Sequence, residues 1–143
     1  MKVFAPKTLF LTLAAAGLAA CSPTKTDSPA AAAQSAESQL MDRHDAVMAQ
    51  TGRLFELRQK IVAARLINAA PYLRGLQAAD GAMMAWMHTY HAPDSTAPAP
   101  QRLAYFQREQ AKLDAVEKHM RGTIDSAAAL LKQAPGNSIP ATK

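Results

Sequence analysis

Four of the histidine and methionine side chains of this 143-residue chain are spaced so that they could together bind a soft metal ion or haem iron. His44 and Met48 lie four residues apart, and so do Met87 and His91. If the two pairs lie on helices that fold back on one another, all four side chains meet at one end of a bundle. Imidazole and thioether groups suit copper(I) or a haem iron. The alternative, which we favour, is that the methionines fill the core and His44 is a hydrogen-bonded structural residue.

The sequence lacks the other signatures of metal, haem or catalytic sites. It contains no CxxCH haem attachment and no HExxH helix. A glycine-rich phosphate loop and a GxSxG nucleophile motif are missing too. A single cysteine rules out a disulfide framework and a cysteine-based zinc site. We therefore expect no catalytic residues, no enzymatic activity and no bound metal or cofactor.

Two arginines form a second candidate group, together with two carboxylates. Arg58 and Arg65 lie seven residues apart, and on a helix they would fall between two rows of apolar residues that also repeat every seven positions. Folding the chain about residues 69–70 brings Arg58 level with Asp80, and a parallel third helix brings Arg65 level with Glu117. Buried charges are costly unless they are paired. The hypothesis is that the pairs Arg58–Asp80 and Arg65–Glu117 set the helix register, and the alternative is that both arginines reach solvent at the groove edge.

The composition and the apolar spacing place these residues on helices. The chain holds 32 alanines and 14 leucines against only 8 valines and isoleucines, which favours helix over strand. Leu40, Val47, Leu54 and Ile61 recur every seven residues, beside a second row made of Met41, Met48, Phe55 and Val62. Similar stripes and the prolines between them predict helices over 38–68, 71–91 and 101–134.

Short connections between amphipathic helices favour antiparallel neighbours. The predicted fold is therefore an all-α, antiparallel three-helix bundle over 38–134 that runs up, down and up. Residues 21–37 are rich in Ser, Pro, Thr and Ala, and we interpret them as a disordered tether. The alternative is that the alanines at 30–33 extend the following helix backward. Residues 135–143 follow a Pro-Gly stop and are expected to form a tail.

The first twenty residues have the pattern of a secretion signal. Lys2 and Lys7 precede an apolar run over residues 8–20, which is too short for the roughly 20 residues that span a membrane. The run ends in Leu18-Ala19-Ala20-Cys21, which resembles the lipobox of bacterial lipoproteins. That resemblance implies cleavage after residue 20, a diacylglyceryl group on Cys21 and acylation of the new amino terminus. It also implies, from Ser22 in place of an acidic residue, sorting to the outer membrane with the domain facing the periplasm.

Removal of the signal also changes the charge. Without Lys2 and Lys7, 14 of the 16 basic residues remain against 11 acidic ones, so the net charge falls from +5 to +3. The basic residues are scattered rather than grouped with aromatics, which argues against a nucleic-acid partner. We expect the membrane, another envelope protein or a second copy as partners.

A further resemblance covers two short runs. They read HDAVM at residues 44–48 and ADGAMMAWMHTY at residues 79–90. Both are similar to small helical lipoproteins labelled with a viral A-type inclusion protein repeat, a label that implies no activity and no site residue. The sequence thus predicts a lipid-anchored helical protein of the bacterial cell envelope that acts as a non-enzymatic interaction or structural module. The alternative is a periplasm-facing copper or haem protein that uses His44, Met48, Met87 and His91.

Overall fold

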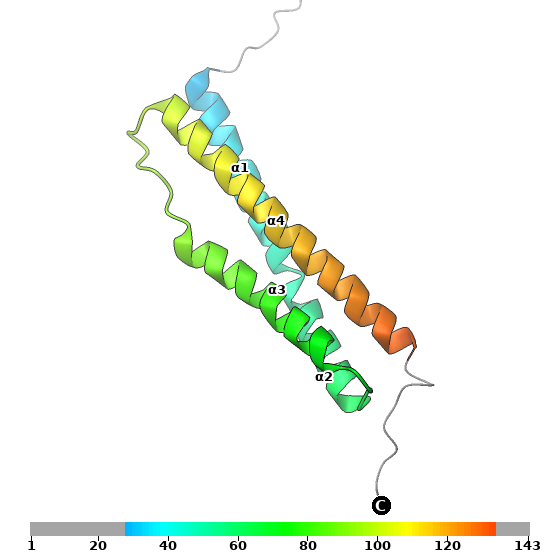
Figure 1. Ribbon diagram of the computed structural model, residues 1–143. Coiled ribbons are helices and arrows are strands. Elements are labelled where there is room, and N and C mark those ends of the chain that lie inside the picture. Colours follow the sequence, from blue (N-terminus) through cyan, green and yellow to red (C-terminus); the bar gives the residue numbers. More distant parts are fainter. Residues whose placement is uncertain (1–27, 134–143) are drawn as a thin grey trace, which may run out of the picture.

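The computed structural model describes residues 28–133, in which four helices account for the regular structure. They are α1 (Pro29–Met48), α2 (Thr51–Ala63), α3 (Ala70–Thr89) and α4 (Ala99–Lys132). The longest helix, α4, lies against the other three (Figure 1). The prediction of an all-helical protein with packed helices is confirmed. None of these four helices is long and apolar enough to cross a membrane.

Several predicted segments lie outside the described residues. They are the signal peptide at 1–20, Cys21 with the first part of the tether, and the tail at 135–143. The second part of the tether is described, and there the prediction is wrong. Helix α1 begins at Pro29 instead of residue 38, with Ser28 as its cap, because the Ser28 side chain accepts a hydrogen bond of 3.2 Å from the Ala31 backbone N–H.

Alanine explains why the tether prediction failed. Ala33 and Ala36 are buried although the segment carries no large apolar side chain. Alanine loses no side-chain entropy in a helix and allows another helix to approach closely. Helix α1 packs along α4, so residues 29–37 gain enough contact to form a helix without a leucine or isoleucine.

The predicted helix 38–68 is also wrong, because the chain breaks at residues 49–50 into α1 and α2. The Thr51 hydroxyl donates to the Met48 carbonyl at 2.7 Å, and the Gln50 N–H donates to the Val47 carbonyl in a tight turn. Gly52 follows directly, and glycine is a poor helix former. A side-chain bond that competes with the helical ladder, followed by glycine, accounts for the interruption.

The two apolar rows differ in burial after the break. Leu40, Val47, Leu54 and Ile61 are all buried, as their spacing predicts. The second row is half-buried at Met41 and Met48 on α1 but turns outward on α2. There Phe55 and Val62 are 65% and 56% exposed, and Leu57 takes the inward position.

The other helix boundaries shift by two residues or fewer, apart from the end of α2. Helix α2 stops at Ala63, and the turn that follows holds Arg65 and Asn68 at positive φ angles of 48° and 63°. Helix α3 covers 70–89 instead of 71–91, and α4 covers 99–132 instead of 101–134. Prolines occupy the first turns of both α3 and α4, where their missing N–H removes no helical hydrogen bond.

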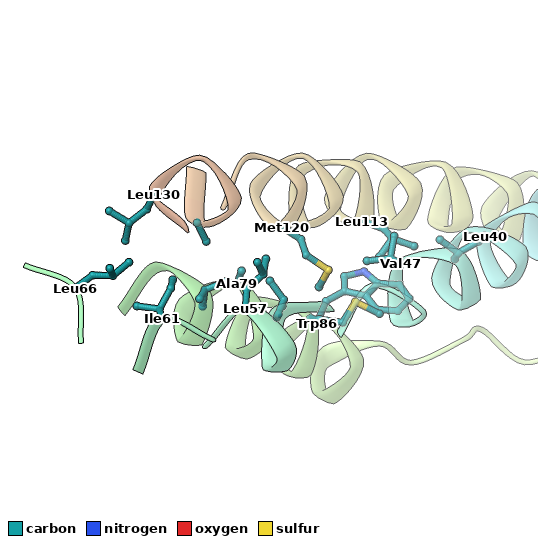
Figure 2. Packing of buried hydrophobic residues seen from close by; sticks show 14 of the residues in the cluster. Leu40, Val47, Leu57, Ile61, Leu66, Ala79, Trp86, Leu113, Met120 and Leu130 are labelled. Atoms are coloured by element: carbon teal, nitrogen blue, oxygen red, sulfur yellow. The ribbon is translucent and has the colours of Figure 1, made fainter. Parts of the chain in front are cut away.

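The core follows the inner side of α4 along its length. Figure 2 shows Leu40 and Val47 of α1, Leu57 and Ile61 of α2, and Trp86 of α3 pointing toward side chains of α4. The α4 partners are Phe106, Leu113, Met120, Ala127 and Leu130, which are all buried. One long helix therefore carries a continuous apolar stripe that the three shorter helices cover in turn.

Candidate functional site

Two of the four candidate metal ligands meet where α1 and α3 end. His44 Nε2 lies 3.3 Å from Met87 Sδ, and its Nδ1 lies 2.9 Å from a carboxylate oxygen of Asp45. The imidazole also packs against the indole of Trp86, with ring centroids 5.7 Å apart. The predicted approach of residues 44 and 87 is thus observed, with His44 held on three sides.

The other two candidates do not join this contact. Met48 is half-buried and packs against the core, whereas the His91 side chain is exposed after the end of α3. The His91 backbone N–H donates to the Tyr105 hydroxyl at 2.9 Å. Within residues 28–133, no group of three or more His, Cys, Asp or Glu side chains is placed to hold a metal ion.

The His44–Met87 contact fits one of the two proposed groups better than the other. Axial haem ligands lie on opposite faces of the macrocycle, so a nitrogen and a sulfur 3.3 Å apart leave no room for haem between them. Trp86 closes a further side of this space. The haem alternative therefore does not fit, while two adjacent soft donors remain compatible with a single copper(I) ion.

A buried carboxylate lies on the other side of Trp86. Glu109 is 3% exposed, and its Oε2 accepts a 3.1 Å hydrogen bond from Trp86 Nε1. Its Oε1 binds the Lys112 ammonium at 2.7 Å, and that ammonium extends toward solvent. Because both oxygens have partners, the buried charge is compensated and fixes α3 against α4. Sequence reasoning missed Glu109, although its position three residues after Phe106 and four before Leu113 places it on the apolar stripe.

Aromatic rings continue from Trp86 to the start of α4. Trp86 stacks on Tyr90 at 5.2 Å between centroids, and Tyr90 lies 6.0 Å from Tyr105. Tyr105 meets Phe106 edge to face, and the Arg102 guanidinium lies 5.9 Å from the Phe106 ring centroid. Burial of the Tyr90 hydroxyl, together with the nearby Tyr105, raises the pKa of Tyr90. These rings join the end of α3 to the start of α4, and the contact of Trp86 with His44 extends the row to α1.

The predicted pair Arg65–Glu117 is not formed. Arg65 lies in the turn after α2, because the helix that was expected to carry it has already ended. Glu117 instead binds Arg43 of α1 at 2.7 Å and Arg121 at 3.3 Å. The interaction does tie α4 to the first predicted helix, but through Arg43, which lies about six helical turns before Arg65 in the sequence.

The predicted pair Arg58–Asp80 is not formed either, although the two residues do lie close to the same groove. Both side chains line one small groove between α2 and α3, together with Phe55 and Gln77. Both are exposed, and neither has a hydrogen bond or an ion pair with any of the residues 28–133. The register predicted from the sequence brings them to the same groove, but solvent competes with the contact between two exposed charges.

A second hollow lies between α3 and α4. It is an open groove of about 780 Å³ whose polar lining comes from Tyr72, Lys118, His119, Thr123 and Ser126. Gly75 and Gly122 form part of its floor, and a methyl group added at Gly122 would meet open space. The groove is wide and shallow, and none of its polar side chains is buried.

No protein-family model, curated protein or solved structure matches this chain.

Proposed function

We propose that this chain is a lipid-anchored protein of the bacterial cell envelope that faces the periplasm and acts by association rather than by catalysis. The anchor rests on the resemblance of Leu18-Ala19-Ala20-Cys21 to a lipobox. Two or more acyl chains hold a protein on a membrane stably, whereas one does so only marginally. Ser22 favours the outer membrane under the sorting rule that this resemblance implies.

The observation that carries the association role is an exposed apolar surface. Four large apolar side chains of residues 28–133 are strongly exposed, and none of them belongs to α1 or α4. They are Phe55, Val62, Ile67 and Met84, with exposed fractions of 65%, 56%, 45% and 42%. Apolar side chains that gather on one part of a surface mark an interaction site more often than scattered ones do.

The proposal includes the finer topology of the bundle. We propose that α1 and α2 together form the first segment of an up-down-up bundle, that α3 and α4 form the second and third, and that the signal peptide and a short tether precede them. The six-residue turn at 64–69 supports a reversal between α2 and α3, and the packing of all three helices on α4 supports a bundle. Since α1 begins at Pro29, the bundle starts within about 29 Å of Cys21 even for a fully extended chain.

The anchor is tested by Cys21→Ser in the full chain. Unsubstituted protein is expected in the membrane fraction after a high-salt wash, with Cys21 carrying a lipid by mass spectrometry. Cys21→Ser is expected in the soluble fraction or as an unprocessed precursor, while the control Ser22→Ala stays membrane-bound. Membrane retention of Cys21→Ser after the salt wash would refute lipid anchoring. In a second variant, Ser22→Asp, the protein is expected to move from the outer to the inner membrane.

A copper(I) carrier is the second candidate, supported by the 3.3 Å approach of His44 Nε2 to Met87 Sδ. Titration of the full chain with copper(I) against a competing chelator distinguishes it from a purely associative role. One bound ion per chain, lost in His44→Gln and Met87→Leu and kept in Met48→Leu, would establish this second function. Absence of competition with the chelator would eliminate it.

A further inference from the structure

The exposed sides of α2 and α3 form one surface. On α2, Phe55, Arg58 and Val62 follow at spacings of three and four residues, so they share one side of the helix. On α3, Asp80 and Met84 are four residues apart and share a side in the same way. Phe55, Arg58 and Asp80 line one groove, which shows that the two sides face each other across it. We call these five residues the α2–α3 face.

The charges on this face have no partners within the described part of the chain. Arg58 and Asp80 form neither an ion pair nor a hydrogen bond there. The other cations of α2 are accounted for, because Arg53 and Lys60 both bind Glu56 and lie on the side of the helix toward α4. These two bonds hold the pKa of the Glu56 carboxyl below its ordinary value. What distinguishes Arg58 and Asp80 from other exposed charges is that these two opposite charges share one groove with the exposed Phe55.

This arrangement is self-complementary. In a two-fold symmetric dimer, residue i of one copy meets residue j of the other, and j meets i. Arg58 and Asp80 lie on the two helices that border one groove. In a symmetric dimer they would therefore form two equivalent contacts, with Arg58 of each copy beside Asp80 of the other. The face carries one positive and one negative charge and is therefore neutral, so contact through it adds no like-charge repulsion to that of the two processed chains, each with a net charge of +3.

We infer that the α2–α3 face binds the same face of a second copy of this chain. Phe55, Val62 and Met84 form the apolar centre, and two symmetric Arg58–Asp80 contacts fix the orientation. The inference deepens the proposed function by naming its partner, and in the cell it rests on that function, because two copies anchored in one membrane meet at raised effective concentration.

The test measures the protein mass of the full chain by analytical ultracentrifugation in a density-matched detergent. This readout does not depend on whether Cys21 carries lipid, so failure of the anchor and failure of the dimer are distinguishable. The unsubstituted chain is expected to sediment as a dimer at micromolar concentration. Arg58→Asp and Asp80→Arg are each expected to weaken dimerisation at least about tenfold, since each places two like-charge contacts across the interface.

Charge reversal also allows a rescue experiment. The double variant R58D/D80R restores both opposite-charge contacts and is expected to dimerise. An equimolar mixture of the two single variants is expected to form a heterodimer for the same reason. Arg108→Asp on α4 and Asp42→Arg on α1 are the controls, because both positions are exposed and make no described polar contact. Circular dichroism confirms that each variant keeps its helix content.

Three results would overturn the inference. A monomeric unsubstituted chain up to about 100 μM would exclude self-association at any strength typical of specific complexes. Dimers that persist in both single reversals would place the interface elsewhere. Loss of dimer in the single variants without recovery in the double variant or the mixture would show that Arg58 and Asp80 do not meet across the interface.

Discussion

Two regions of the molecule, the α1–α4 contact and the α2–α3 face, both combine apolar side chains with arginines and carboxylates. In the first region these charges are paired, and in the second they are not. Along α1 and α4, Arg43 binds Glu117 at 2.7 Å and Arg102 binds Glu37 at 2.9 Å, above buried Leu40 and Val47. On the α2–α3 face, Arg58 and Asp80 stay apart and the nearby Phe55 is 65% exposed. The first region forms its ion pairs within one chain, although the buried Arg102 Nε is left without a hydrogen-bond partner in the described residues. The difference is what the proposed pairing of the α2–α3 face with a second copy of this chain would explain.

Two valines give the largest expected contrast between these regions. Val47→Ala on α1 removes a fully buried side chain and is expected to lower the free energy of unfolding by roughly 2–3 kcal/mol. Val62→Ala on α2 removes the same atoms from a position 56% exposed, and under monomeric conditions it is expected to change that free energy by less than about 0.5 kcal/mol. Urea denaturation measures both. Equal losses would show that α2 does not present an open face.

The junction between the two regions is expected to respond to loss of the buried carboxylate. Glu109→Ala leaves the buried Trp86 N–H without its acceptor and is expected to destabilise the fold by about 1–3 kcal/mol. Glu109→Gln keeps an acceptor oxygen and serves as the matched control. Thermal unfolding followed by Trp fluorescence reports on both variants. Equal destabilisation by alanine and glutamine would mean that the charge, rather than the bond to Trp86, is what matters.

Double-mutant cycles compare the charges directly. Removing Arg43 and Glu117 singly and together is expected to give a coupling of about 0.5–1 kcal/mol, since the pair is formed and Glu117 is mostly buried. The cycle on Arg58 and Asp80 in the monomer is expected to give a coupling of about zero, because no bond joins them. If the coupling energy between Arg58 and Asp80 in the monomer were as large as that between Arg43 and Glu117, the two residues would already be paired within one chain, which would contradict the account.

The smallest expected effect concerns alkaline pH. Because the pKa of Tyr90 is raised in the folded state above its ordinary value of 10.0, folding favours the protonated phenol. This contribution to stability is fully present below pH 10 and is lost as the pH rises through the folded-state pKa. Tyr90→Phe is therefore expected to lose less stability above pH 10 than the unsubstituted chain. Identical slopes in denaturation measured from pH 9 to 12 would contradict the burial of Tyr90.

The sequence predicted the class of the fold and failed where small or local effects decide. Heptad spacing correctly predicted that Leu40, Val47, Leu54 and Ile61 are buried, because a repeat of apolar residues has one energetically acceptable orientation. It did not predict the break before Gly52, because a hydroxyl-to-carbonyl bond at Thr51 leaves the apolar pattern unchanged. That break turns Phe55 and Val62 outward and so creates the α2–α3 face.

For the candidate site, the sequence predicted which residues lie level with one another but not which side chains form a bond. The approach of His44 to Met87 and of Arg58 to Asp80 follows from counting residues around a hairpin, which fixes which positions are level. Whether level side chains bond depends on rotamers and solvent competition, which residue counting does not contain. Glu109 was missed because a glutamate on an apolar stripe is ordinarily read as a stripe edge, and its Trp86 partner lies on another helix.

Thiol cross-linking in intact cells tests the central claim, association through the α2–α3 face, most directly. Gln77→Cys introduces a thiol in the groove beside Asp80, and Gln107→Cys introduces one at an exposed position of α4. The unsubstituted chain, whose single cysteine is Cys21, gives the baseline. The account predicts a dimer of this chain with Gln77→Cys and only the baseline with Gln107→Cys. Equal cross-linking of the two variants, or no dimer with Gln77→Cys, would contradict it.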